Sequence, residues 1–143
     1  MNKLTLDFCT QVLAHAQKFA AELGKPMAFA MVDASGHLVA LHRMDGARFL
    51  TPEIALGKAF SAAAFGVPSA ELRERAKNLP NFATAISAMT DGKYIPQTGA
   101  VPIKMDGAIV GAMGASGGTG EEDEDVCKCA VETVVSHQQS EVR

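Results

Sequence analysis

A glycine-rich stretch, residues 101–125, constrains the fold more than any other part of the chain. Its first half alternates apolar residues and then meets Asp106-Gly107, a dipeptide typical of two-residue hairpin turns. The return segment, residues 108–115, holds only small and apolar residues, which indicates a buried strand. A polar glycine loop, 116–120, and five acidic residues, 121–125, come next, and carboxylates favour the positive end of a helix. The stretch therefore predicts a hairpin that leads through a loop into a final helix.

The glycines of this stretch do not form a phosphate-binding motif. The sequence contains no GxxxxGK[ST], and GAMGASGG does not fit the strand-to-helix spacing of a dinucleotide fingerprint. Glycines inside a strand more often mark the close approach of another backbone or of a ligand. We therefore expect this strand to line one wall of a groove, with the helix that carries Lys58 and the loop 45–48 as its opposite wall.

The remaining elements follow from hydrophobic periodicity and from capping and turn residues. Thr5 is a plausible N-cap for the first helix, and the nearly all-apolar segment MAFAMV predicts a central strand. The expected helices are 6–23, 51–65, 70–77, 82–89 and 121–137, and the expected strands are 27–33, 38–44, 101–105 and 108–115. We expect the tail, 138–143, to be frayed. The order α-β-β-α-α-α-β-β-α predicts an α+β domain in which the terminal helices cover an antiparallel sheet.

Composition limits the functions that the chain can have. A length of 143 residues fits one domain, so we expect a single domain over 1–143. The net charge of −3 argues against nucleic acid as the main partner, because phosphate binding needs a basic face. No apolar run is long enough for a membrane span, and the N-terminus lacks a signal-peptide pattern. Three cysteines, an odd number, favour reduced thiols, so we expect a cytoplasmic protein.

The four histidines do not have the spacing of a metal site. They lack the H-x-x-H and H-E-x-x-H patterns, and the cysteines lack C-x-x-C, so we expect no preformed metal centre. A single histidine can still ligate haem iron if an apolar slot holds the macrocycle. His15 and His42 are the candidates, since apolar residues surround both in the expected elements. The alternative for each is an ordinary surface or hydrogen-bonded histidine.

Lys58 is the single residue that most suggests chemistry. It is the only charge after Glu53 in the helix EIALGKAFSAAAF, and a buried charge must be paired, extended to solvent or used. It could hold a ligand carboxylate or a propionate, or act as a base with a lowered pKa. The alternative is an ion pair with Asp45 or with another acid.

The acidic run 121–125 could bind a hard cation, but it lacks the alternation and the central glycine of a calcium loop. We interpret it as a helix start, where each well-placed carboxylate contributes about 0.3–1 kcal/mol. No nucleophile–base–acid triad is visible, since Ser61 and Ser116 have no histidine at a fixed spacing.

Three stretches together resemble the GlcG/HbpS-like family of haem-binding or haem-degrading domains, which includes the C-terminal domain of PduO-type proteins. They are VDASGHLVALHRMDGA, ALGKAFSAAAFGVPSAEL and GAVPIKMDGAIVGAMGASGGTGEEDEDV, in the family's order. The resemblance implies a profilin-like three-layer α/β/α arrangement around an antiparallel sheet, and it implies homo-oligomers. Where many members have Gly-Gly before Val-Pro, this chain has Thr98-Gly99-Ala100.

The resemblance implies two functions. The first is binding, with or without degradation, of haem or a related tetrapyrrole, in which Lys58 or Arg48 neutralises propionates and His15 or His42 reaches the iron. The second is an enzyme like the family's lyase that acts on a hydroxylaminobenzoate, with Lys58 and Arg48 as catalytic candidates that hold a substrate carboxylate. The residues expected to contact the ligand are His15, His42, Lys58, Thr98, Gly99, Ser116 and Gly117.

Overall fold

The computed structural model describes residues 3–142, which form five helices and four strands. In chain order they are α1 (Leu6–Glu22), β1 (Ala28–Asp33), β2 (Leu38–Arg43), α2 (Thr51–Phe65), α3 (Ser69–Asn78), α4 (Pro80–Met89), β3 (Ala100–Met105), β4 (Ala108–Ser116) and α5 (Gly120–Val142). This is the predicted order, and the α+β class is confirmed.

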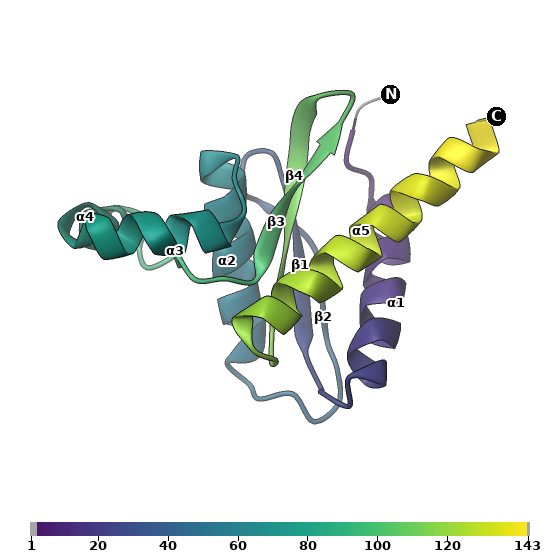
Figure 1. The fold of residues 1–143 in the computed structure, drawn as a ribbon, viewed down its shortest axis with the longest axis horizontal. Coiled ribbons are helices and arrows are strands. Elements are labelled where there is room, and N and C mark those ends of the chain that lie inside the picture. Colours follow the sequence, from purple (N-terminus) through teal and green to yellow (C-terminus); the bar gives the residue numbers. More distant parts are fainter. Residues whose placement is uncertain (1–2, 143) are drawn as a thin grey trace.

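The four strands form one antiparallel sheet in the order β2-β1-β4-β3 (Figure 1). Strands β1 and β4 occupy the centre, and this position explains why their residues are apolar on both faces. The hairpin turn has positive φ at both Asp106 (50°) and Gly107 (80°), as a type I′ turn requires. The Asp-Gly turn signal therefore located the β3–β4 hairpin correctly.

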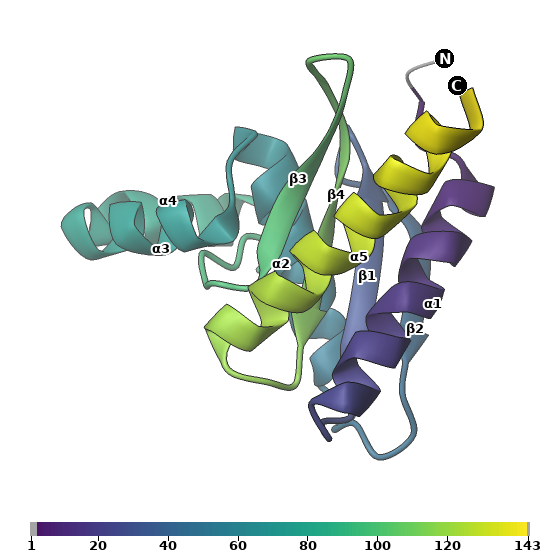
Figure 2. The ribbon, with the colours of Figure 1, turned by 45° about the vertical axis from the view of Figure 1, so that its right-hand side comes forward.

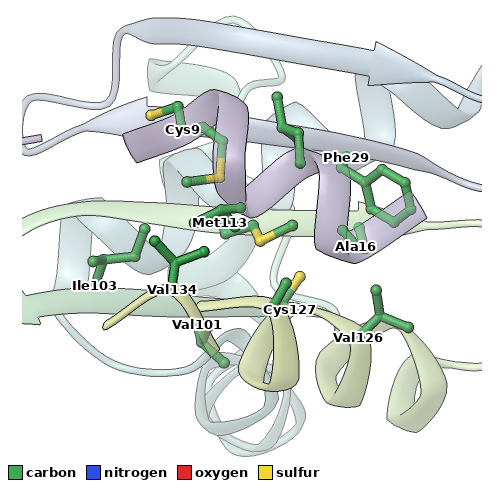
Figure 3. Packing of buried hydrophobic residues seen from close by; sticks show 14 of the residues in the cluster. Cys9, Ala16, Phe29, Val101, Ile103, Met113, Val126, Cys127 and Val134 are labelled. Atoms are coloured by element: carbon green, nitrogen blue, oxygen red, sulfur yellow. The ribbon is translucent and has the colours of Figure 1, made fainter. Parts of the chain in front are cut away.

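The larger hydrophobic core lies between the sheet and the two terminal helices. Helices α1 and α5 run side by side in opposite directions across the same face of the sheet (Figure 2). Thr5 caps α1, because its hydroxyl accepts a hydrogen bond from the amide of Phe8 at 3.1 Å. Phe29 and Met113 of the central strands meet Cys127 and its neighbours in this core (Figure 3).

The opposite face of the sheet is covered by α2, through a core built almost wholly from alanine and valine. The glycines of β4 make this close contact possible, because a Cβ at Gly114 would lie 2.2 Å from the carbonyl oxygen of Ala55. At Gly114 the expected groove between this strand and the Lys58 helix is absent, because the two backbones touch there.

Helices α3 and α4 project from the layered domain as a helical hairpin (Figure 1). Helix α4 has no buried residue, although its sequence PNFATAISAM is largely apolar. Phe82 is 52% exposed and Met89 is 74% exposed. An apolar helix that buries nothing within its own chain is typical of a helix that packs against another molecule.

The C-terminal helix is longer than expected. It continues past His137 to Val142, so the prediction of a frayed tail is wrong for residues 138–142, and Arg143 lies outside the described residues. Of the two cysteines of α5, Cys127 is buried in the core and Cys129 is exposed. In residues 3–142 no helix is long and apolar enough to cross a membrane.

Candidate functional site

A buried ion pair between Lys58 and Asp123 lies at the junction of α2, β4 and α5. Lys58 Nζ is 3.0 Å from Asp123 Oδ2, and the side chains are 7% and 3% exposed. The same ammonium group donates to the carbonyl oxygen of Ala115 at 3.1 Å. This answers the sequence question about Lys58: the lysine is paired, with an acid from the 121–125 run rather than with Asp45.

Asp123 also organises the glycine loop. Its Oδ1 accepts a hydrogen bond from the amide of Gly118 at 2.9 Å, and its own amide donates to the carbonyl oxygen of Thr119 at 2.8 Å. Burial raises the pKa of Asp123, while the charge of Lys58 and these hydrogen bonds oppose that rise. The carboxylate is therefore held in place by donors on two sides.

Glu122 caps the N-terminus of α5 together with Thr119. Its carboxylate accepts hydrogen bonds from Lys25 and from the amide of Thr119, while the Thr119 hydroxyl accepts from the amide of Glu122. These contacts form a capping box. They lower the pKa of Glu122, with the Lys25 hydrogen bond as the largest cause.

A polar pocket of about 380 Å³ opens beside the ion pair. It brings together three predicted site residues, Lys58, Thr98 and Ser116. The other lining residues are Ile54, Arg73, Gln97, Gly118, Gly120, Glu121 and Asp123. Thus residues that lie more than 60 positions apart in the sequence meet at one opening, and we name it the Lys58 pocket.

The remaining predicted residues of this region have backbone roles. Gly99 has a φ of 139°, and a Cβ there would lie 2.7 Å from Lys58 Nζ, so the glycine makes room for the lysine. Gly117 has a φ of 130°, and a Cβ would lie 2.7 Å from the carbonyl oxygen of Pro26. Arg48 is exposed in the loop before α2, and it does not line the Lys58 pocket.

The two histidines that were predicted as iron ligands lie in different surroundings. His42 is on the edge strand β2, opposite Phe29 of β1, and its Nδ1 is buried without a hydrogen-bond partner among the described residues. His15 is half-buried on α1, and its ring stacks on Phe19 with centroids 6.5 Å apart. Both imidazoles are half-buried, and His15 is the one whose ring contacts Phe19.

His15 has a second aromatic neighbour that the sequence did not indicate. The ring of His137, from α5, lies 5.8 Å from that of His15, because α1 and α5 run antiparallel and place residue 15 beside residue 137. A shallow hollow of about 420 Å³ lies beside the pair, and it is lined by Phe19, Cys129, Glu132, Thr133, Ser136 and His137. His15 does not line the hollow itself but contacts two of its lining residues, Phe19 and His137. We name this the His15–His137 face.

Asp123 was the main functional residue that the sequence analysis missed, although a signal for it exists. Residues 126, 127, 130 and 134 of α5 are buried, and position 123 precedes them at helical spacing. This helical spacing predicts that one of the five acidic residues faces the core and needs a partner there. Within residues 3–142, no group of three or more histidine, cysteine or acidic side chains is placed to hold a metal ion.

The sequence comparisons agree with the resemblance. A family model described as "Haem degrading protein HbpS-like" matches residues 4–132. The chain is similar to Protein GlcG of Escherichia coli strain K12, with 32% identity over 113 residues that cover 79% of this chain and 81% of GlcG.

Solved structures show the same fold. The Klebsiella pneumoniae protein ORFY superposes with a TM-score of 0.86 at 27% identity, over 94% of this chain and 92% of ORFY. A PduOC chain, whose crystal structure is a complex with haem, superposes with a TM-score of 0.82 at 28% identity, over 91% of this chain and 94% of PduOC. The neighbours therefore share the layered domain over nearly the whole of this chain.

Proposed function

Because the chain belongs to the HbpS-like family, we propose that it binds haem or a related tetrapyrrole at the His15–His137 face. The haem complex of PduOC supports haem as the ligand class. The observation that carries the proposal is the position of His15, a half-buried imidazole between Phe19 and His137 beside an open hollow. A haem site needs one such histidine together with apolar surface for the macrocycle.

The residues of this face suit the parts of a haem. The His15 imidazole would ligate the iron, and the ring of Phe19 would contact the macrocycle edge. Lys18 is exposed one helical turn after His15, where its ammonium group can reach a propionate. Lys58 is not free for this task, because Asp123 already pairs it.

Haem, when bound, would supply the iron chemistry, while the residues of the chain bind and orient it. We propose haem degradation only as a further activity of the bound haem, and this reaction would need an added reductant and oxygen. Cys9, Cys127 and Cys129 are unpaired thiols, which fits our proposal of a reducing, cytoplasmic location.

A hemin titration followed by the Soret band tests the proposal. We expect a saturable spectral shift that is strongly weakened in His15→Ala and retained in His37→Ala, a matched histidine in the exposed β1–β2 turn. His42→Ala should also retain the shift, because His42 lies on β2, outside the His15–His137 face. An unsaturable shift, or one that is equal in His15→Ala and His37→Ala, would exclude ligation by His15.

We also propose that the chain works as a homo-oligomer. The apolar residues Phe82 and Met89 of α4 are 52% and 74% exposed within the described chain, and a second copy would cover them. Helix α4 would then be an assembly element, since none of its residues lines either candidate site.

A small-molecule enzyme is the second candidate function. The observation in its favour is that Lys58, Thr98 and Ser116 share one pocket, although Arg48, the other expected catalytic residue, does not line it. Incubation with a hydroxylaminobenzoate, followed by its ultraviolet absorbance, tests this candidate. Turnover that is lost in Ser116→Ala would support it, and unchanged absorbance with the intact protein would exclude that substrate.

A further inference from the structure

The Lys58 pocket contains hydrogen-bond donors that the fold does not use. We propose that it is a ligand site distinct from the His15–His137 face, and that it takes a short monocarboxylate with a further polar group. The two sites share only α5, and they use different parts of it. The pocket is lined from α2, α3, the loop before β3, the end of β4 and the first turn of α5, whereas the haem face joins α1 and the second half of α5.

The first unused donor belongs to Lys58. An ammonium group has three N–H bonds, and the fold uses two of them, for Asp123 and for the carbonyl oxygen of Ala115. The lysine side chain lines the pocket, so the third N–H is available to a ligand there. Because the ion pair is buried, a hydrogen bond to this ammonium group is weakened little by solvent.

The second donor is the hydroxyl of Ser116. This residue is 7% exposed and lines the pocket, and its hydroxyl makes no hydrogen bond with the described residues. The hydroxyl oxygen itself is accessible, so water or a ligand in the pocket can reach it. Thr98 places another hydroxyl on the same wall.

The start of α5 adds backbone donors. The amides of Glu122 and Asp123 are satisfied by Thr119, whereas those of Gly120 and Glu121 have no partner among the described residues. Gly120 lines the pocket, so a free amide and the positive end of the helix meet the two side-chain donors. The donors together suit the two oxygens of a carboxylate.

The charges of the pocket select a monoanion. Lys58 and Asp123 neutralise each other, which leaves one cation, Arg73, and one anion, Glu121, among the ionised lining residues. A pocket whose charged side chains sum to zero, beside the positive N-terminus of a helix, can bind a ligand with one negative charge. It provides too little positive charge to bind a phosphate dianion well. Ile54 contributes the one apolar side chain to the lining, so a short polar acid fits better than an aromatic one.

A titration monitored by amide chemical shifts tests the proposal, with sodium lactate as the probe and with benzoate, phosphate and chloride at matched ionic strength. We expect lactate to shift the amides of Gly118 and Gly120 saturably. Arg73→Gln and Ser116→Ala should each weaken lactate binding about tenfold or more, because each removes a hydrogen bond to a charged ligand. Arg75→Gln is the matched control, since it makes the same change on the same helix outside the pocket.

Three results would overturn the proposal: no saturable lactate shift, equal weakening by Arg75→Gln and Arg73→Gln, or phosphate that binds more tightly than lactate. A hemin titration of the same variants separates this site from the haem face. We expect Arg73→Gln and Ser116→Ala to keep the parental Soret shift, and its loss in both variants would show that the two sites are one.

Discussion

Lys58 and Asp123 are 65 positions apart in the sequence, yet their charged groups meet 3.0 Å apart in the protein interior. The contact joins the middle of α2 to the first turn of α5, and Lys58 also binds the backbone near the end of β4. One ion pair thereby fixes the glycine loop between sheet and helix, and it forms the floor of the Lys58 pocket.

Lys58→Met should destabilise the fold strongly, because it leaves the carboxylate of Asp123 buried without its cation. We expect the free energy of unfolding to fall by about 3–5 kcal/mol, the usual result when one partner of a buried pair is removed. Adding Asp123→Asn should restore most of the loss, since the amide oxygen can still accept from Gly118. Urea denaturation of the two single variants and the double variant measures this coupling, and additive losses would contradict it.

Two residues of the acidic run, Glu122 and Asp123, should change the stability of the protein in opposite directions as the pH falls. The pKa of Glu122 is lowered from its ordinary value of 4.5, so its contribution to stability is present above pH 4.5 and is lost as the pH falls through the lowered pKa. Glu122→Gln should therefore show a smaller drop in Tm between pH 7 and pH 3.5 than the parent protein. Asp125→Asn, an exposed acid of the same run, is the control, and an equal drop in all three proteins would refute the assignment.

Asp123 should behave in the reverse way. Its folded pKa is raised from the ordinary value of 3.8, so protonation favours the native state, and the stability gained by protonation is lost as the pH rises through the raised pKa. Protonation of Asp123 should therefore offset part of the stability that acid removes through Glu122.

The sequence predicted the fold closely because its signals are local. The Asp-Gly turn, the apolar segment MAFAMV and the Thr5 cap each determine an element from neighbouring residues. The candidate sites depend on contacts between distant segments. The pairing of Lys58 with Asp123, and of His15 with His137, follows from how the helices pack, which local patterns do not specify. The expected groove failed for the same reason, since glycines allow close approach without showing whether a helix or a ligand fills the space.

Gly114→Ala should destabilise the protein more than Gly107→Ala. A methyl group at position 114 would overlap the backbone of α2 at Ala55, so the helix must move, at a cost of about 3 kcal/mol. At Gly107 a methyl group meets no atom within 4 Å, and only its φ of 80° costs energy, about 1 kcal/mol. Thermal unfolding of both variants checks the order, and equal losses would show that contact with α2 does not limit residue 114.

One thiol per chain should react with Ellman's reagent in the native protein. Cys129 is exposed, whereas burial raises the pKa of Cys9 to about 11 and raises that of Cys127 further. All three thiols should react in denaturant. Cys129 lines the hollow beside His137, so hemin should slow its reaction in the parent protein but not in His15→Ala. A rate that hemin leaves unchanged would place the haem elsewhere.

Charge on the exposed face of α4 should separate the subunits of the proposed oligomer. Phe82→Glu and Met89→Glu each place a carboxylate where we expect another copy to pack, and burying an unpaired charge there would be costly. Thr84→Glu is the control, because this exposed position lies on another side of the same helix. Light scattering after size-exclusion chromatography should show smaller particles for the first two variants and the parental mass for the third. Neither side chain is buried within its own chain, so Tm should change little where the oligomer contributes little to the stability of each subunit. A parental mass in all three variants would exclude α4 from the interface.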